Sequence, residues 1–74
     1  MQEKINTKIL KKLLKVAVEQ KNPGNCVNIK DVVKTKKDFE DLIFLSCMRF
    51  VEILGPNNSW TRITDNGVIY LKLM

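Results

Sequence analysis

Residues 60–71 constrain the fold of this chain more than any other segment, because a strand pattern runs directly into a helix with its own cap. Thr61 and Ile63 carry β-branched side chains, which favour extended backbone. Thr64 follows at the place where a hydroxyl group caps a helix. Gly67 then leaves out a side chain, so the helix can approach its neighbour closely. The predicted helix takes its apolar surface from Val68, Ile69 and Leu71.

The same segment resembles the end of a winged helix-turn-helix domain. In that family, the second strand of the wing and the helix after it commonly read aromatic-x-Leu-Thr-x-x-Gly-x-x-Tyr-Leu. The resemblance implies a wing hairpin that leads into a C-terminal helix, and it implies a fold more directly than a function. The matching residues are Trp60, Ile63, Thr64, Gly67, Tyr70 and Leu71, with Ile63 in the place of Leu.

A first helix is predicted between residues 5 and 20, where apolar residues recur at helical spacing with lysines on the other side. A basic amphipathic helix can also lie on an anionic membrane or in a partner's groove. This one has no Trp or Phe to anchor it there, so packing against a core is favoured. Residues 22–25, Asn-Pro-Gly-Asn, end the helix. The apolar positions are Ile9, Leu10, Leu13, Leu14 and Ala17, and the lysines are Lys8, Lys11, Lys12 and Lys15.

Two more helix starts follow from a capping residue placed three positions before an acid. Asn28 begins a short helix over residues 29–34, and Thr35 begins a longer one over residues 36–50. Two helices joined by a tight polar turn form a helix-turn-helix unit, whose second helix would enter the major groove of DNA. The predicted buried stripe of the longer helix is Phe39, Leu42, Ile43, Ser46, Cys47 and Phe50.

A hairpin is predicted near the C-terminus. Residues 51–54 and 60–63 both favour strand, and residues 55–59, Gly-Pro-Asn-Asn-Ser, form a polar turn between them. Residues 27–29 are short and β-prone, which makes them a candidate third strand. In the winged-helix interpretation, this hairpin is the wing.

Together these elements predict an α+β fold of the winged helix-turn-helix type. The predicted order is helix, strand, helix, helix, strand, strand, helix, with a small three-helix core and a two- or three-stranded antiparallel sheet. Residues 1–74 form a single domain in this prediction. Residues 35–45 and the strand after them also resemble small prophage-associated winged-helix proteins.

Cysteine content and hydropathy indicate a soluble cytoplasmic protein without a membrane partner. Cys26 and Cys47 can form at most one bridge, too few for a secreted disulfide framework, and we expect both to be reduced and buried. The longest nearly apolar run, residues 42–48, is far shorter than the roughly 20 residues of a membrane span. The N-terminus lacks the apolar region of a signal peptide.

The residue types that enzymes depend on are scarce. The chain has no histidine, which excludes Ser-His and Cys-His nucleophile pairs and an imidazole metal site. It also lacks a glycine-rich phosphate loop and a Cys-x-x-Cys pair. Asp38, Glu40 and Asp41 suggest a carboxylate cluster, but acids in the first turn of a helix more simply complement its dipole. We expect no enzymatic activity, no cofactor and no metal site.

Positive charge is concentrated in the first half of the chain. Residues 1–37 contain ten lysines against three acidic residues, whereas residues 38–74 contain three basic and five acidic residues. Such an imbalance favours an anionic partner such as duplex DNA, with lysines that merely solvate a small domain as the alternative. Candidate DNA contacts are Lys30, Lys34, Thr35, Lys36, Lys37, Arg49, Asn57, Asn58 and Arg62. Of the lysines, we expect Lys34, Lys36 and Lys37 to matter more than Lys11 and Lys12.

The longer helix is poorly suited to reading bases, because acids lie near its start and no Arg, Asn or Gln precedes Arg49. The sequence is therefore compatible with two functions. The chain is either a transcriptional regulator, expected as a homodimer, that holds duplex DNA mainly through phosphates, or a winged-helix protein-interaction module that binds a protein partner and no DNA. The exposed face of residues 36–49 separates them: a basic face favours DNA, and an acidic or apolar face favours a protein partner.

Overall fold

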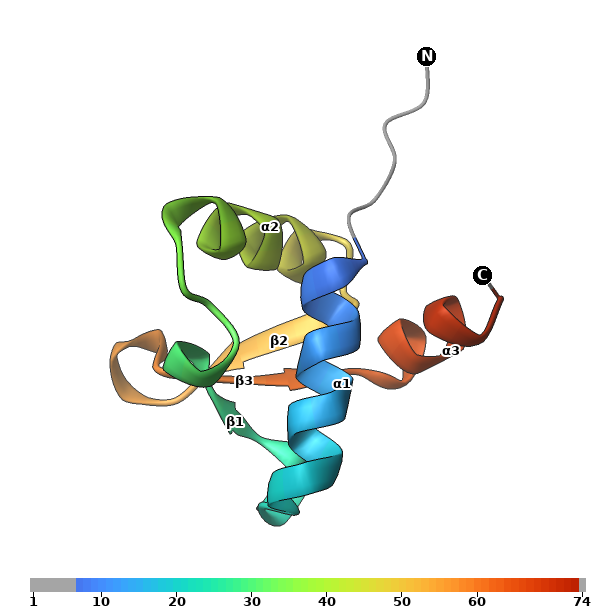
Figure 1. The fold of residues 1–74 in the computed structure, drawn as a ribbon, viewed down its shortest axis with the longest axis horizontal. Coiled ribbons are helices and arrows are strands. Elements are labelled where there is room, and N and C mark those ends of the chain that lie inside the picture. The colour runs from blue at the N-terminus through green and yellow to red at the C-terminus, as the bar shows by residue number, and fades with distance from the viewer. Residues whose placement is uncertain (1–6, 74) are drawn as a thin grey trace.

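The computed structural model describes residues 7–73, which fold into three α-helices and one three-stranded antiparallel sheet (Figure 1). This confirms the predicted α+β class and the third strand, and the layout is compatible with a winged-helix arrangement. The helices are α1 (Lys8–Gln20), α2 (Lys36–Cys47) and α3 (Asp65–Leu73), and the strands are β1 (Val27–Asn28), β2 (Val51–Leu54) and β3 (Trp60–Ile63). Single 3-10 turns lie at Pro23–Asn25 (η1), Ile29–Asp31 (η2) and Pro56–Asn58 (η3).

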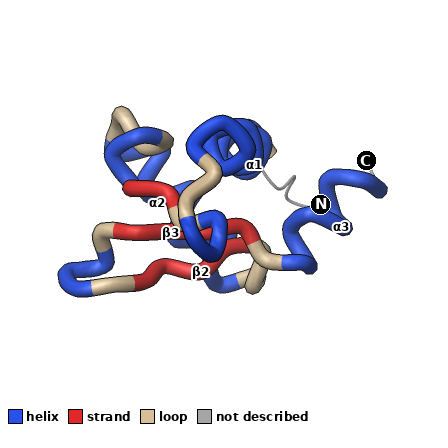
Figure 2. The backbone as a smooth tube through the Cα atoms, turned by 90° about the horizontal axis from the view of Figure 1, so that it is seen from below, coloured by secondary structure: helices blue, strands red, loops and turns tan. Residues whose placement is uncertain are grey.

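The sheet has the order β1-β3-β2, so the central strand is the last one in the sequence. Val51 pairs with Ile63 at one end of the hairpin, and Val27 of β1 pairs with Thr61 on the other side of β3. Thr61 is fully buried, and its Oγ1 donates a hydrogen bond to the carbonyl oxygen of Glu52 at 2.8 Å. Because that hydroxyl has a partner, the polar residue can occupy the core without an unsatisfied group. Figure 2 shows α1 lying on one side of this sheet.

The core forms where α1 and α2 meet the inner face of the sheet. The predicted first helix is confirmed from Lys8 onward, while the start of its predicted range lies outside the described residues. Each fully buried aliphatic side chain stabilises the fold by roughly 1.5–3 kcal/mol, so a small set of them can hold a short chain together. The buried apolar residues are Ile9, Leu10, Leu13, Ala17, Val27, Val32, Leu42, Leu45 and Val51.

The step from β3 into α3 has the predicted capping geometry. Thr64 Oγ1 accepts a hydrogen bond from the N–H of Gly67 at 3.1 Å. A Cβ atom on Gly67 would overlap the carbonyl oxygen of Phe50 and lie 2.8 Å from Cγ1 of Ile63. Close approach of α3 to the end of α2 therefore requires glycine, as predicted. The rings of Phe50 and Tyr70 stack beside this contact, with centroids 4.6 Å apart.

The predicted helix over residues 29–34 is wrong, because the structure has only the 3-10 turn η2 there. Asn28 caps this turn as expected, accepting a hydrogen bond from the N–H of Lys30 at 2.9 Å. Two β-branched valines follow, which disfavour helix. Thr35 must then be extended, with φ −132° and ψ 165°, to cap α2. Too few residues remain between the two caps for a second α-helix.

The predicted length and buried stripe of the longer helix are also corrected. The helix ends at Cys47 instead of Phe50, because Arg49 adopts a left-handed backbone with φ 64°. Its buried residues are Leu42 and Leu45, so the inner face is rotated by roughly 100° from the predicted one. Both thiols are free, but neither is buried: Cys26 is half-buried and Cys47 is exposed.

Candidate nucleic-acid interface

The turn before α2 is organised by a reciprocal cap. Thr35 Oγ1 accepts a hydrogen bond from the N–H of Asp38 at 3.1 Å. In return, the Asp38 carboxylate accepts hydrogen bonds from the N–H groups of Lys34 at 3.0 Å and of Thr35 at 3.3 Å. The bond from Lys34 is the main reason that the pKa of Asp38 lies below its usual value, and the nearby charge of Lys12 acts in the same direction. Thus Thr35 serves as the cap of α2, and its hydroxyl is already engaged.

The lysines around this turn are not equally available to a ligand. Lys37 forms an ion pair with Asp41 at 3.0 Å, and this hydrogen bond raises the pKa of Lys37. Lys34 Nζ donates to the carbonyl oxygen of Lys30 at 2.9 Å, which is an uncharged partner. Within residues 7–73, no ion pair joins Lys30 or Lys36 to a carboxylate. Lys30, Lys34 and Lys36 are therefore the strongest anion-binding candidates of the predicted turn cluster.

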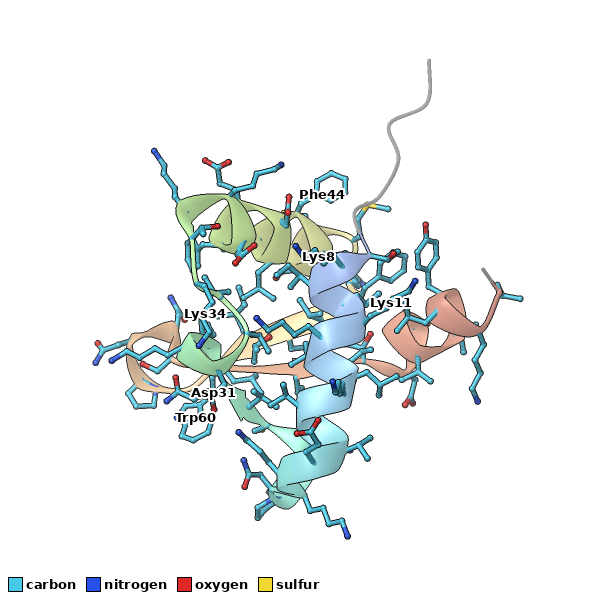
Figure 3. All side chains as sticks on the ribbon, in the orientation of Figure 1. Lys8, Lys11, Asp31, Lys34, Phe44 and Trp60 are labelled. Atoms are coloured by element: carbon cyan, nitrogen blue, oxygen red, sulfur yellow. The ribbon has the colours of Figure 1, made fainter. Side chains whose placement is uncertain are left out.

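The lysines of α1 lie on the same side of the sheet as this turn. Ile9, Leu10, Leu13 and Ala17 face the sheet, so the opposite side of α1 presents its lysines to solvent. Figures 1 and 2 show η2 beside α1 on that side, and Figure 3 shows Lys34 at the turn before α2, whereas Lys11 projects from α1 toward α3. A hydrogen bond of 2.9 Å from Gln20 to Asp31 ties the end of α1 to η2.

We use the name lysine surface for Lys12, Lys15, Lys30, Lys34 and Lys36. Lys12 lies close enough to Asp38 for its charge to lower the pKa of that carboxyl group. Sequence reasoning gave the α1 lysines little weight because it treated α1 by itself. The sequence shows that these lysines lie on the side of the helix away from Ile9 and Leu13. Only the packing of α1 onto the sheet places them beside η2.

Arg49 is not brought to this surface. Arg49 lies just beyond the C-terminal end of α2, whereas Lys36 is the first residue of that helix. At 1.5 Å per residue α2 is about 18 Å long, so nearly the whole length of the helix separates the two residues. The carbonyl oxygen of Arg49 accepts a hydrogen bond from Thr64 Oγ1 at 2.7 Å. The backbone of Arg49 thus joins α2 to α3, while its side chain is exposed.

The predicted contacts of the hairpin are also separate from the lysine surface. Asn57 and Asn58 both adopt left-handed backbone, with φ 60° and 52°, as the tight turn requires. Arg62 donates from Nε at 3.0 Å and from Nη2 at 2.8 Å to Oε1 of Glu52. The hydrogen bond with Glu52 raises the pKa of Arg62 and offsets its charge. Because Arg62 alternates with buried Thr61 along β3, it lies on the face of the sheet opposite α1.

The exposed side of α2 carries two pairs of apolar side chains, Phe39 with Ile43 and Phe44 with Met48, which lie on opposite edges of that side. Phe39, Ile43, Phe44 and Met48 keep between 40% and 44% of their surface exposed. Glu40 and Cys47 are exposed as well, whereas the lysines of α2 are confined to its first turn. This face therefore offers little to a base edge or a phosphate.

A surface hollow of about 410 Å³ lies beside Trp60. It is lined by Asn22, Pro23, Cys26, Leu54, Gly55 and Trp60. These lining residues include no carboxylate and no basic side chain. In the part of the chain that the structure describes, no cluster of three or more His, Cys, Asp or Glu side chains is placed to hold a metal ion. Within residues 7–73, no helix has the length and apolar character needed to cross a membrane.

No protein-family model matches this chain, and no match was found among curated proteins or solved structures.

Proposed function

We propose that this chain is a winged-helix DNA-binding protein, acting as a transcriptional regulator, that holds duplex DNA through phosphate contacts from the lysine surface. The observation behind the proposal is that lysines from three separate elements share one side of the sheet, and within residues 7–73 no ion pair joins Lys30, Lys34 or Lys36 to a carboxylate. Ammonium groups so arranged suit a polyanion, because each phosphate contact releases counterions from the duplex.

The proposal assigns little sequence preference to α2. Phosphate contacts hold a protein on DNA without reading the bases, and base reading needs polar side chains on the element that enters the groove. The exposed face of α2 lacks such side chains between Glu40 and Arg49. We therefore expect binding with similar affinity to duplexes of different sequence.

The exposed apolar residues of α2 favour a second candidate, a winged-helix protein-interaction module that does not bind DNA. Exposed apolar residues that gather on one part of a surface commonly mark a protein interface. The two candidates use different surfaces, so they differ in one measurable property, the affinity for duplex DNA at low salt.

A fluorescence anisotropy titration of labelled mixed-sequence duplexes at several salt concentrations tests the proposal. We expect log affinity to fall linearly with log salt, with a slope of roughly −0.9 for each phosphate contacted. Absence of binding at low salt would reject DNA binding and leave the protein-interaction module. Tight binding to one sequence alone, with a shallow salt slope, would show that bases are read and would also contradict the proposal.

A further inference from the structure

The surface hollow beside Trp60 takes no part in the proposed DNA interface. Trp60 pairs with Asn28 on one side of β3 and with Leu54 on the other. It alternates with buried Thr61 along the strand, so its ring lies on the face of the sheet opposite α1. Figure 3 shows Trp60 at the end of the sheet far from α3. We use the name Trp60 hollow for the space lined by Asn22, Pro23, Cys26, Leu54, Gly55 and Trp60.

We propose that the Trp60 hollow binds a small uncharged aromatic molecule, whose ring packs against the indole of Trp60. A ligand of this class carries one hydrogen-bonding group and no ionised group, and indole and phenol are examples. The inference does not depend on DNA binding, because the lysine surface lies on the α1 side of the sheet (Figure 2).

Gly55 holds the Trp60 ring in place. Its backbone has φ 85°, a conformation that favours glycine, and a Cβ atom there would lie 2.8 Å from Cδ1 of Trp60. The indole therefore packs directly on the backbone of the hairpin turn. The remaining 38% of Trp60 stays exposed and is available to a ligand. A ring that is already ordered loses little conformational freedom when it binds.

The side chains of the lining determine the charge of the ligand. Pro23, Leu54 and Trp60 provide apolar surface, and none of the six lining residues carries a charge. A charged ligand would lose hydration here without gaining an opposite charge. An uncharged aromatic ring can stack offset or edge-to-face on the indole, which adds to the free energy gained by burying its surface.

Few hydrogen-bonding atoms of the lining side chains are left for a ligand. Nδ2 of Asn22 donates to Oε1 of Gln20 at 2.9 Å and to the carbonyl oxygen of Cys26 at 3.0 Å. The Cys26 thiol lies 4.0 Å from the carbonyl oxygen of Gly24. Within residues 7–73, Oδ1 of Asn22 accepts no hydrogen bond and Nε1 of Trp60 donates none. One acceptor and one donor suit a ligand with a single N–H or O–H group.

The size of the hollow predicts weak binding of a small ligand. Its volume of about 410 Å³ lies near the lower end of the roughly 300–1,000 Å³ that small-molecule sites occupy. The exposed ring of Trp60 shows that the hollow opens to solvent, so a bound ring keeps part of its surface in water. We therefore expect a dissociation constant of roughly 1 mM for a bicyclic probe.

An NMR titration of the isotope-labelled full chain with unlabelled indole, without DNA, tests the proposal. Trp60 is the only tryptophan of the chain, so its Nε1–H resonance reports on the hollow without ambiguity. We expect a saturable shift of this resonance and of the amide resonances of Gly55 and Cys26, all with one dissociation constant. Shifts that stay linear in indole concentration, or that spread evenly over the chain, would overturn the proposal.

Three variants locate the binding site. Leu54→Glu keeps the Trp60 reporter but adds a charge to the lining, and it should weaken indole binding by at least about fivefold. Trp60→Ala should abolish the saturable shifts at Gly55 and Cys26. Phe44→Ala is the matched control, because Phe44 is 42% exposed but lies on α2, and it should bind as the wild type does. Dispersed amide spectra establish that each variant is folded. A folded Trp60→Ala chain with wild-type affinity would contradict the proposed site.

Phenol and cyclohexanol test the aromatic character of the ligand, because both are uncharged six-carbon rings with one hydroxyl group. We expect phenol to shift the Trp60 resonance at concentrations where cyclohexanol does not, since only phenol can stack on the indole. Equal shifts would refute an aromatic ligand. A Trp60 resonance that moves with protein concentration alone would show that a second copy occupies the hollow instead. Since no DNA is present, these results leave the proposed DNA binding untouched, and a failure to bind DNA leaves the hollow untouched.

Discussion

At the scale of single residues, Gly67 decides how α3 joins the rest of the molecule. Helix α3 begins directly after Thr64, whose hydroxyl oxygen accepts a hydrogen bond from the N–H of Gly67. The absence of a side chain then lets the carbonyl group of Phe50 approach the α3 backbone directly. Two opposing effects meet here. Glycine costs a helix interior roughly 1 kcal/mol relative to alanine, whereas a methyl group forced into a packed contact costs about 1–3 kcal/mol.

We expect Gly67→Ala to destabilise the fold by up to roughly 2 kcal/mol, because its Cβ would overlap backbone atoms that cannot move aside cheaply and the gain in helix propensity offsets about 1 kcal/mol of that cost. The midpoint of urea unfolding measures this change. Asn66→Ala, at an exposed neighbouring position in the same helix, serves as the control and should change the midpoint little. A higher midpoint for Gly67→Ala would mean that helix propensity outweighs the contact.

At the scale of elements, the cap of α2 explains both where this helix begins and why η2 stays short. The Asp38 carboxylate binds two backbone N–H groups of the turn, so the turn cannot continue the helical pattern of η2. These bonds favour the ionised form of Asp38 in the folded protein, which lowers its pKa from the usual 3.8. A carboxylate with a lowered pKa stabilises the folded state above its unfolded pKa, and this contribution is lost as pH falls through the folded pKa.

Asp38→Asn should therefore lower the melting temperature at neutral pH. Its difference from wild type should begin to shrink near pH 3.8, where the unfolded carboxyl group takes up its proton, and should continue to shrink as the pH falls through the lower pKa of folded Asp38. Thermal melts followed by circular dichroism across this pH range measure the effect. Glu40→Gln is the control for net charge. It removes one negative charge from the same turn but leaves in place the Asp38 carboxylate that accepts the backbone N–H groups. A difference that stays constant with pH would refute the stabilising role of the Asp38 charge.

At the scale of the whole molecule, the lysines gather away from the later turns of α2. The lysine surface spans α1, η2 and the start of α2, whereas the exposed apolar residues of α2 begin at Phe39. A helix-turn-helix reader would present polar side chains where this protein presents Phe39, Ile43 and Phe44. Substitutions at the lysine surface can therefore be made without changing these apolar residues.

Alanine substitutions test the lysine surface as a unit. We expect the double variant at Lys12 and Lys15 and the triple variant at Lys30, Lys34 and Lys36 each to weaken binding to every duplex and to flatten the salt slope. The slope should become shallower by up to roughly 0.9 for each phosphate that the variant no longer neutralises. The same anisotropy titration at several salt concentrations provides the measurement.

Lys72→Ala provides the control for this series, because Lys72 is an exposed lysine of α3. It removes one positive charge outside the lysine surface and should change affinity little. If it weakens binding as much per charge as the variants of the lysine surface do, attraction depends on net charge instead of on a defined surface.

The local elements of this protein follow from residues close together in the sequence. The strands over residues 51–54 and 60–63, the turn between them, and the caps at Thr35 and Thr64 were all predictable. Each depends on backbone preference and on hydrogen bonds that span only a few positions. Gly67 was predictable for the same reason, since a glycine inside an apolar helix indicates close packing.

Tertiary packing alone decided which face of α2 turns inward. Residues 39–48 are apolar on two sides, so spacing allows either Phe39 with Ile43 or Leu42 with Leu45 to meet the core. The sheet and α1 accept the leucines, and the other side remains exposed. The position of the lysines of α1 beside η2 was likewise decided by packing. The sequence shows which residues share a face of a helix, but only the folded molecule shows which other element that face meets.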